Sequence, residues 1–392
     1  MKRVWNYVVT MWQPASAFVL ISLILVVLFS FRLATLVTGT AEIERDTRVS
    51  SQSISNILDN PIDAPYRLAQ FAGQQIHESI IVERLISGVI AGISVILFFY
   101  IVRRFCNFHA TIFATILYGT SSSLLVSGRL ASAQISLLLL FILSVCGYRL
   151  ITNSNRYRYM ILAVIVLALA LYSPGLLYFI VAGAIWQFKN LKNSVRKLSA
   201  LQIVLSSILF IALVTPLLLG LFESQGLWRE YLGIPNTTPS VIDFIKNVAA
   251  VPAGVIAFAP YNPLFRLGKQ PVLDAFTAVV LIVGIYDVFK RFRLDRFKLL
   301  AGVFILATLY TAVAGNYENS FILLPFIYLT VAIGLSYLLT EWNKTFPNNP
   351  LAKWLAVIVM TLAVIVSSNY QTRRYFIAWP NNIQTREIFT LE

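Results

Sequence analysis

The sequence predicts an all-α integral membrane protein, a polytopic bundle of about eleven transmembrane helices. Of its 392 residues, 58% are hydrophobic and only 12% are charged, whereas a soluble domain carries about 25% charged residues. Apolar runs recur along the whole chain, which excludes an ordinary soluble enzyme, a disordered protein and a single-span anchor. The alternating ten-residue segments of a membrane β-barrel are absent, so the spans are expected to be helical.

Eleven apolar runs define the predicted spans. A span needs about 20 apolar residues, and several runs are shorter, which predicts tilted or partial helices. The break at Ser173-Pro174-Gly175 favours a turn and divides one long run into two. The runs cover residues 15–35, 85–102, 111–126, 131–148, 159–172, 175–188, 201–222, 272–289, 299–314, 321–339 and 354–368.

The basic residues predict the orientation. With eleven crossings, the side that carries the N-terminus holds 18 of the 31 Lys and Arg residues but only three of the 17 Asp and Glu residues. The positive-inside rule then places the N-terminus in the cytoplasm and the C-terminus outside. We therefore expect a transmembrane domain over residues 1–368 and a short extracytoplasmic tail over residues 369–392. The expected location is a bacterial plasma membrane, with membrane lipids and no nucleic acid as partners.

Two long outer loops, the first and the fourth, are expected to carry amphipathic surface helices. The first loop covers residues 37–80, where Asp63 is expected to cap a helix. The fourth covers residues 223–271, where Ser240 begins a capping-box helix that Pro252 is expected to stop.

A metal centre or a bound cofactor is not expected. The two histidines, His77 and His109, are too few for a His-based site, and the sequence has no CxxC pattern. The two cysteines, Cys106 and Cys146, have apolar neighbours and are interpreted as packing residues.

Acidic residues cluster in the first outer loop, directly after the first span. The segment TGTAEIERD contains Glu42, Glu44 and Asp46. A carboxylate at the membrane boundary can have a raised pKa and act as a general base. The competing interpretation is a solvated face on which acidic and basic residues alternate for solubility.

Four further residues are candidates for substrate binding. Arg84 begins the second span, and Arg129 lies in the outer turn after the third. Guanidinium groups match phosphate oxygens, although a snorkelling role at a helix end is the alternative for each. Tyr317 and Glu318 belong to a polar turn before the tenth span, for which ordinary turn chemistry is the alternative.

These residues carry a resemblance. The acidic first loop, the block of residues 83–150 with its SGR outer turn, and NYENSFILLPFIYLTVAIGL at residues 316–335 resemble the GT-C superfamily of polyprenyl-phosphate-sugar-dependent glycosyltransferases. The protein O-mannosyltransferase and aminoarabinose-transferase branch is the most similar. The likeness is diffuse and spans most of the chain.

The resemblance implies an inverting membrane glycosyltransferase with its site at the outer face. A polyprenyl-phosphate sugar would be the donor, and a protein, lipid or glycan the acceptor. Glu42 is the nearest equivalent of the family's first-loop carboxylate, and arginines such as Arg84 and Arg129 would hold the phosphate. The sequence lacks the usual C-terminal outer domain and the family's first-loop Asp, which leaves a non-catalytic relative as an alternative.

A lipid or solute transporter is the other competing class. Transporters generally carry ionisable residues at mid-membrane depth, whereas nearly every charge here lies at the end of an apolar run.

Overall fold

The structure is a computed structural model that describes residues 19–33, 35–153, 157–223, 226–235, 239–260 and 262–389. Within these ranges every regular element is a helix, which confirms the all-α prediction. The start of the first predicted span, at residues 15–18, lies outside the described ranges.

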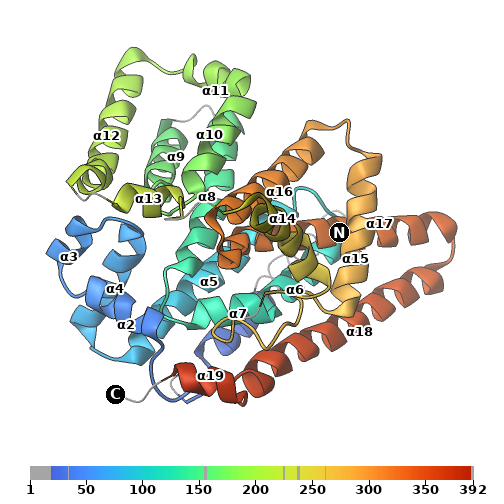
Figure 1. The fold of residues 1–392 in the computed structure, drawn as a ribbon. Helices are drawn as coiled ribbons and strands as arrows, with labels where there is room; N and C mark the ends of the chain where they lie inside the picture. Colours follow the sequence, from blue (N-terminus) through green and yellow to red (C-terminus); the bar gives the residue numbers. More distant parts are fainter. Residues whose placement is uncertain are drawn as a thin grey trace.

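Each of the eleven predicted apolar runs overlaps a helix (Figure 1). The first helix is Val19–Ser30. It is followed by α2 (Glu42–Ser50), α3 (Ile54–Asp59), α4 (Ala64–Ile76), α5 (Ile80–Val102), α6 (Phe108–Thr120), α7 (Ser122–Arg129), α8 (Gln134–Asn153), α9 (Tyr157–Ala170), α10 (Leu176–Trp186), α11 (Phe188–Val195), α12 (Ala200–Glu223), α13 (Leu227–Leu232), α14 (Val241–Ile256), α15 (Ala275–Lys290), α16 (Asp295–Ala314), η1 (Tyr317–Leu323), α17 (Leu324–Thr345), α18 (Pro350–Arg373), η2 (Arg374–Ala378) and α19 (Ile383–Ile388).

Five helical segments of the described chain are long and apolar enough to cross a membrane, or six if the bent pair α6 and α7 forms one span. Four further apolar helices are shorter: Val19–Ser30, Gln134–Tyr148, Tyr157–Ala170 and Leu176–Trp186. The chain is thus a polytopic helical membrane protein, and the count of eleven crossings stays a prediction. The break at Ser173-Pro174-Gly175 is confirmed, because α9 and α10 are separate helices and Gly175 has a φ of +80°.

The helices α15 and α17 pack closely against each other. A Cβ atom at Gly284 would overlap the carbonyl oxygen of Thr330, and one at Gly334 would overlap that of Val280. Small residues let two helix backbones approach in this way. Nearly every residue from Leu324 to Leu335 of α17 is buried, with Tyr328 only 1% exposed, so the first half of this helix is covered on all sides.

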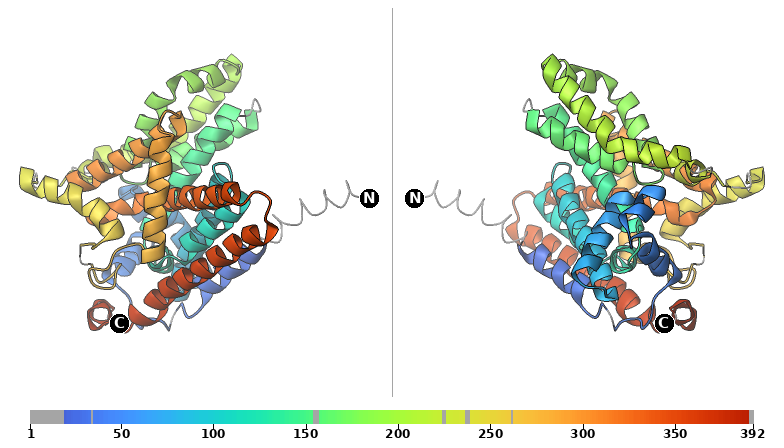
Figure 2. Two further views of the ribbon diagram at one scale, coloured as in Figure 1. Left: turned by 90° about the vertical axis from the view of Figure 1, so that its right-hand side faces the viewer. Right: turned by 90° about the vertical axis from the view of Figure 1, so that its left-hand side faces the viewer.

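The two ends of the described chain lie together. The first helix runs beside α18 in both views of Figure 2, and the rings of Phe31 and Phe376 lie 5.9 Å apart. Residue 369 lies within α18, which continues to Arg373 and is followed by η2 to Ala378, and the extracytoplasmic tail stays a prediction. Beyond them the indole of Trp379 donates to the carbonyl of Pro263 at 3.1 Å, so the chain end packs on the fourth outer loop.

Helices occur in both long outer loops, as α2–α4 and as α13 and α14. The prediction that Pro252 stops a helix is wrong, since α14 continues to Ile256. A proline removes one helical hydrogen bond, but the end of α14 is held from outside. The carbonyls of Gly254 and Val255 accept the backbone N–H groups of residues 272 and 273 at 3.0 and 3.1 Å.

Candidate functional site

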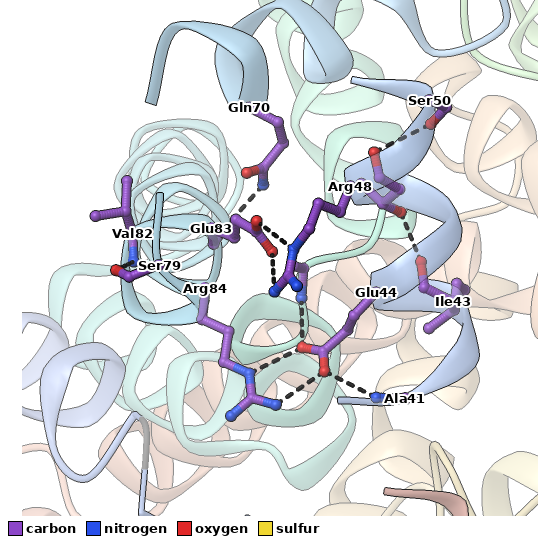
Figure 3. Close-up of polar contacts among 12 residues, drawn as sticks. Ala41, Ile43, Glu44, Arg48, Ser50, Gln70, Ser79, Val82, Glu83 and Arg84 are labelled. Carbon is purple, nitrogen blue, oxygen red and sulfur yellow. Dashed lines mark hydrogen bonds and ion pairs between the residues drawn. The ribbon is translucent and has the colours of Figure 1, made fainter. Parts of the chain in front are cut away.

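Two ion pairs join the first outer loop to the start of α5 (Figure 3). Arg84 forms a bidentate ion pair with Glu44, with Nε–Oε1 and Nη2–Oε2 distances of 2.8 Å. The side chains are 4% and 0% exposed. Beside them, Nε of Arg48 donates to Oε1 of Glu83 at 2.8 Å. This first-loop network therefore fixes α2 against α5 by charge-assisted hydrogen bonds.

The Glu44–Arg84 pair is satisfied within the protein. Arg84 also donates to the carbonyls of Leu33 and Gly39 at 3.0 Å each. Glu44 accepts the backbone N–H of Ala131 at 3.1 Å. The competing interpretation, a solvated face, is therefore wrong for Glu44, because the loop folds back onto α5 and buries it. Its predicted catalytic role stays a prediction. All three guanidinium nitrogens of Arg84 already have acceptors, and its predicted phosphate role stays untested.

The other two predicted catalytic acids lie on the exposed surface of α2. Glu42 is in the first turn of this helix and Asp46 is one turn further along, and both side chains are exposed. Both carboxylates are accessible to a molecule in the surrounding water. The choice of Glu42 as a general base stays a prediction.

A third carboxyl group of the first loop, Asp63, is distinguished by its surroundings. It occupies the N-cap position of α4 with a φ of +55°, but its side chain does not cap the helix as the sequence suggested. Instead Oδ1 accepts the hydroxyl of Ser173 at 2.9 Å. Burial raises the pKa of Asp63 to about 7, against the opposing effects of Ser173 and Arg67. A carboxyl group with such a pKa is suited to proton transfer at neutral pH.

A second polar centre lies between the start of α17, the end of α18 and the fourth outer loop. Two small adjoining cavities, of about 20 and 10 Å³, share the side chains of Ser123 and Arg266. Tyr317 and Glu318 line one of them, and Arg374 lines the other. We call these five residues and the space between them the arginine cavity.

The charges of the arginine cavity do not balance. Nη2 of Arg266 contacts Oε2 of Glu318 at 3.2 Å, and its guanidinium lies 4.1 Å from the centre of the Tyr317 ring. Arg374 is 7% exposed, and its Nη1 donates to the carbonyl of Pro271 at 2.7 Å. Two guanidinium groups thus share one lining carboxylate, an arrangement suited to an anionic ligand.

Arg129 is buried outside both cavities. Its Nε donates to the hydroxyl of Tyr375 at 3.1 Å, and its two terminal nitrogens donate to the carbonyls of Leu28 and Phe31. The guanidinium also lies 4.9 Å from the ring centre of Phe376. Tyr375 itself lines the arginine cavity on the Arg374 side. Arg129 therefore joins three helices behind that cavity, and its predicted phosphate contact stays untested.

A much larger apolar cavity lies elsewhere in the bundle, and exposed residues of α10 form part of its wall. It has a volume of about 480 Å³ and is lined mainly by side chains from α5, α8, α10, α16 and α17. Ligand pockets typically have volumes of about 300–1,000 Å³. A cluster of three or more His, Cys, Asp or Glu residues that could hold a metal is not found among the described residues.

Neither a protein-family model nor a curated protein sequence matches the chain. A solved structure does. The chain is similar to the crystal structure of ArnT from Cupriavidus metallidurans bound to undecaprenyl phosphate, with a TM-score of 0.57 and 12% sequence identity. The match covers 95% of this chain and 76% of that one. The chain thus has a polytopic helical fold similar to that of ArnT. At this identity the likeness shows the fold alone.

Two residues of the arginine cavity were candidates from the sequence. Tyr317 and Glu318 were predicted as ligand contacts and both line one of the small cavities, and their role in binding stays a prediction. Arg266 and Arg374 were not predicted as ligand contacts. Each lies more than 50 residues from Tyr317 along the chain, and neither belongs to a recognisable motif. The available signal was a basic residue near an outer helix end, which many membrane proteins share.

Proposed function

We propose that the protein is a membrane glycosyltransferase that moves a sugar from a polyprenyl-phosphate donor to an acceptor at the extracytoplasmic face. The observation that carries this proposal is the arginine cavity, a partly uncompensated basic site at the ends of α17 and α18. The similarity to ArnT bound to undecaprenyl phosphate supports a lipid phosphate as the anion. The donor tail would lie between the helices.

Arg266 and Arg374 would bind the donor phosphate. Both cavities are small, with room for about one water molecule each, so the phosphate would replace Glu318 as the partner of Arg266. Negative charge grows on this phosphate as its bond to the sugar breaks. Guanidinium groups that are already in place stabilise that charge without reorganisation. The ring of Tyr317 positions the Arg266 guanidinium through a cation–π contact.

A carboxylate of the first outer loop would act as the general base. The acceptor oxygen attacks the anomeric carbon from the side opposite the phosphate, its proton moves to the carboxylate, and polyprenyl phosphate leaves, so the configuration inverts. Glu42 and Asp63 are the two candidates. Glu42 is exposed at the start of α2, whereas Asp63 is already poised to exchange a proton near pH 7.

The test is a transfer assay with purified protein and labelled polyprenyl-phosphate sugars. A general base contributes about 10²–10⁴-fold in rate, so either Glu42→Gln or Asp63→Asn should reduce turnover by that order while donor binding is kept. Asp59→Asn is the matched control, since this acid is exposed in the same loop and is not a candidate for the base. Donor binding without transfer in the unmodified protein would instead identify a non-catalytic relative, and vectorial movement of the lipid would identify a transporter.

A further inference from the structure

The large apolar cavity has a single polar end. Apart from Trp186, its polar lining side chains are Ser144, Tyr148, Gln187 and Lys298. The hydroxyl of Tyr148 donates to Oε1 of Gln187 at 2.7 Å, so the ends of α8 and α10 meet there. Lys298 lies in the first turn of α16. We call this region the basic end of the cavity.

The opposite end of the cavity is apolar. Leu309 of α16 and Pro325 and Phe326 of α17 line it there. Lys298 and Leu309 are eleven residues apart on one helix, which corresponds to about 16 Å at 1.5 Å per residue. This length is close to one leaflet of a hydrocarbon core that is about 30 Å thick. The cavity thus has the dimensions of a single lipid chain.

The helix that follows α10 brings further lysines to the neighbourhood of the basic end. The short helix α11 contributes Leu191 to the cavity lining and carries Lys189 and Lys192 on its exposed surface. No carboxylate occurs among the side chains that line the cavity in the described ranges. Basic residues at a membrane surface attract anionic lipids, with about 1 kcal/mol for each Lys or Arg.

We propose that this cavity binds one anionic phospholipid, with an acyl chain between the helices and the phosphate at Lys298, Lys189 and Lys192. The lipid belongs to the leaflet at the basic end, which the sequence predicts to be cytoplasmic. The site differs from that of the proposed donor and does not depend on the proposed function.

Two features of α17 separate this lipid from the donor. The arginine cavity lies at the outer end of this helix, whereas the basic end lies at the start of α16, on the opposite side of the bundle by the predicted topology. In addition, Leu324 and Ile327 line the arginine cavity, while Pro325, Phe326 and Leu329 line the apolar one. The two spaces are therefore on different faces of α17, and a donor phosphate held at Arg266 would not lie at the basic end.

Glycines in the cavity wall provide a sharp test. Gly183 and Gly302 both line the cavity, and a Cβ atom at either would have no heavy atom within 4 Å. A side chain can therefore start from either position without a clash at its Cβ atom, and leucine is a better helix former than glycine. Gly302→Leu should therefore fold and exclude the lipid chain. Lys298→Gln should keep the cavity and weaken only the contact with the headgroup.

The measurement is native mass spectrometry of the full chain titrated with phosphatidylglycerol, phosphatidylcholine or undecaprenyl phosphate. Lys298→Gln should weaken phosphatidylglycerol binding about fivefold and leave phosphatidylcholine unchanged, while Gly302→Leu should abolish the strongest phospholipid binding event. Lys344→Gln is the matched control, because this exposed lysine pairs with Glu341 and does not line the cavity. Wild-type binding of phosphatidylglycerol by both variants would overturn the proposal. So would loss of undecaprenyl phosphate, and not of phosphatidylglycerol, from Gly302→Leu.

Discussion

The first-loop network and the arginine cavity both bury guanidinium groups, yet they differ in how these charges are neutralised. Arg84 forms a bidentate ion pair with Glu44, and backbone carbonyls accept its other hydrogen bonds. Arg266 and Arg374 share one lining carboxylate and border open space. Removing one partner from a buried charge with a complete set of partners leaves an uncompensated charge and destabilises the fold. A buried charge with an incomplete set beside a cavity is the stronger sign of a ligand.

Removal of the first-loop carboxylate should have the largest effect on stability. Glu44→Gln keeps the shape of the side chain but leaves Arg84 buried without a counter-charge. Breaking a buried pair in this way costs about 3–5 kcal/mol, so the thermal unfolding temperature of the detergent-solubilised protein should fall markedly. Glu42→Gln should leave it unchanged, since that side chain is exposed. Equal unfolding temperatures for the two variants would show that the Glu44–Arg84 pair does not hold the loop.

Substitution of a glycine beside the arginine cavity should lower both the stability of the protein and its affinity for the donor lipid. A Cβ atom at Gly254 would collide with the hydroxyl of Tyr317, so Gly254→Ala should displace this ring from Arg266. Overpacking of this kind costs about 1–3 kcal/mol, and affinity for undecaprenyl phosphate should fall as well. Gly92→Ala is the control, because a Cβ atom there would have no neighbour within 4 Å. Unchanged affinity in Gly254→Ala would separate Tyr317 from phosphate binding.

A substitution in the arginine cavity should reduce ligand binding more than stability, whereas Glu44→Gln should mainly reduce stability. Arg374→Gln removes a hydrogen-bonding charge worth about 1.5–3 kcal/mol, so undecaprenyl phosphate should bind roughly tenfold more weakly or worse. The unfolding temperature should change less than in Glu44→Gln. Arg373→Gln is a matched control, since Arg373 precedes Arg374 in the chain but is exposed. If both arginine variants bind equally well, the cavity is not the phosphate site.

The sequence predicted the architecture better than the site, and the reason is physical. Apolar runs and the Ser173-Pro174-Gly175 break act locally, so the helices follow them. Partners of charged residues depend on how distant segments meet. Glu44 looked solvated beside Arg45 in the sequence, but its partner Arg84 lies 40 residues away and becomes its neighbour only after the loop folds back. Arg374 and Arg266 converge in the same way.

Asp63 belongs to neither of the two regions compared above, since it is neither ion-paired like Glu44 nor exposed like Glu42. Its backbone N–H donates to the carbonyl of Tyr172 at 2.9 Å, so its carboxyl group is held against the turn between α9 and α10. Arg67, on its own helix, and Glu230, on α13, are the charged groups that act on it in opposite directions. Burial outweighs both and favours the neutral acid.

The smallest expected effect is a pH dependence of stability that comes from this one group. Because the pKa of Asp63 is raised from 3.8 to about 7, the folded protein binds a proton that the unfolded chain releases between these values. Its contribution to the free energy of unfolding is therefore full below pH 4 and is lost as the pH rises through 7, with a slope of at most about 1.4 kcal/mol per pH unit. Asp63→Asn cannot lose this proton, so its stability relative to the unmodified protein should rise from pH 4 to pH 8. Asp59→Asn, an exposed acid of the same loop, should show no such trend in unfolding scans across this range. A flat difference for Asp63→Asn would mean that water reaches the carboxyl group, and Glu42 would then be the better candidate for the base.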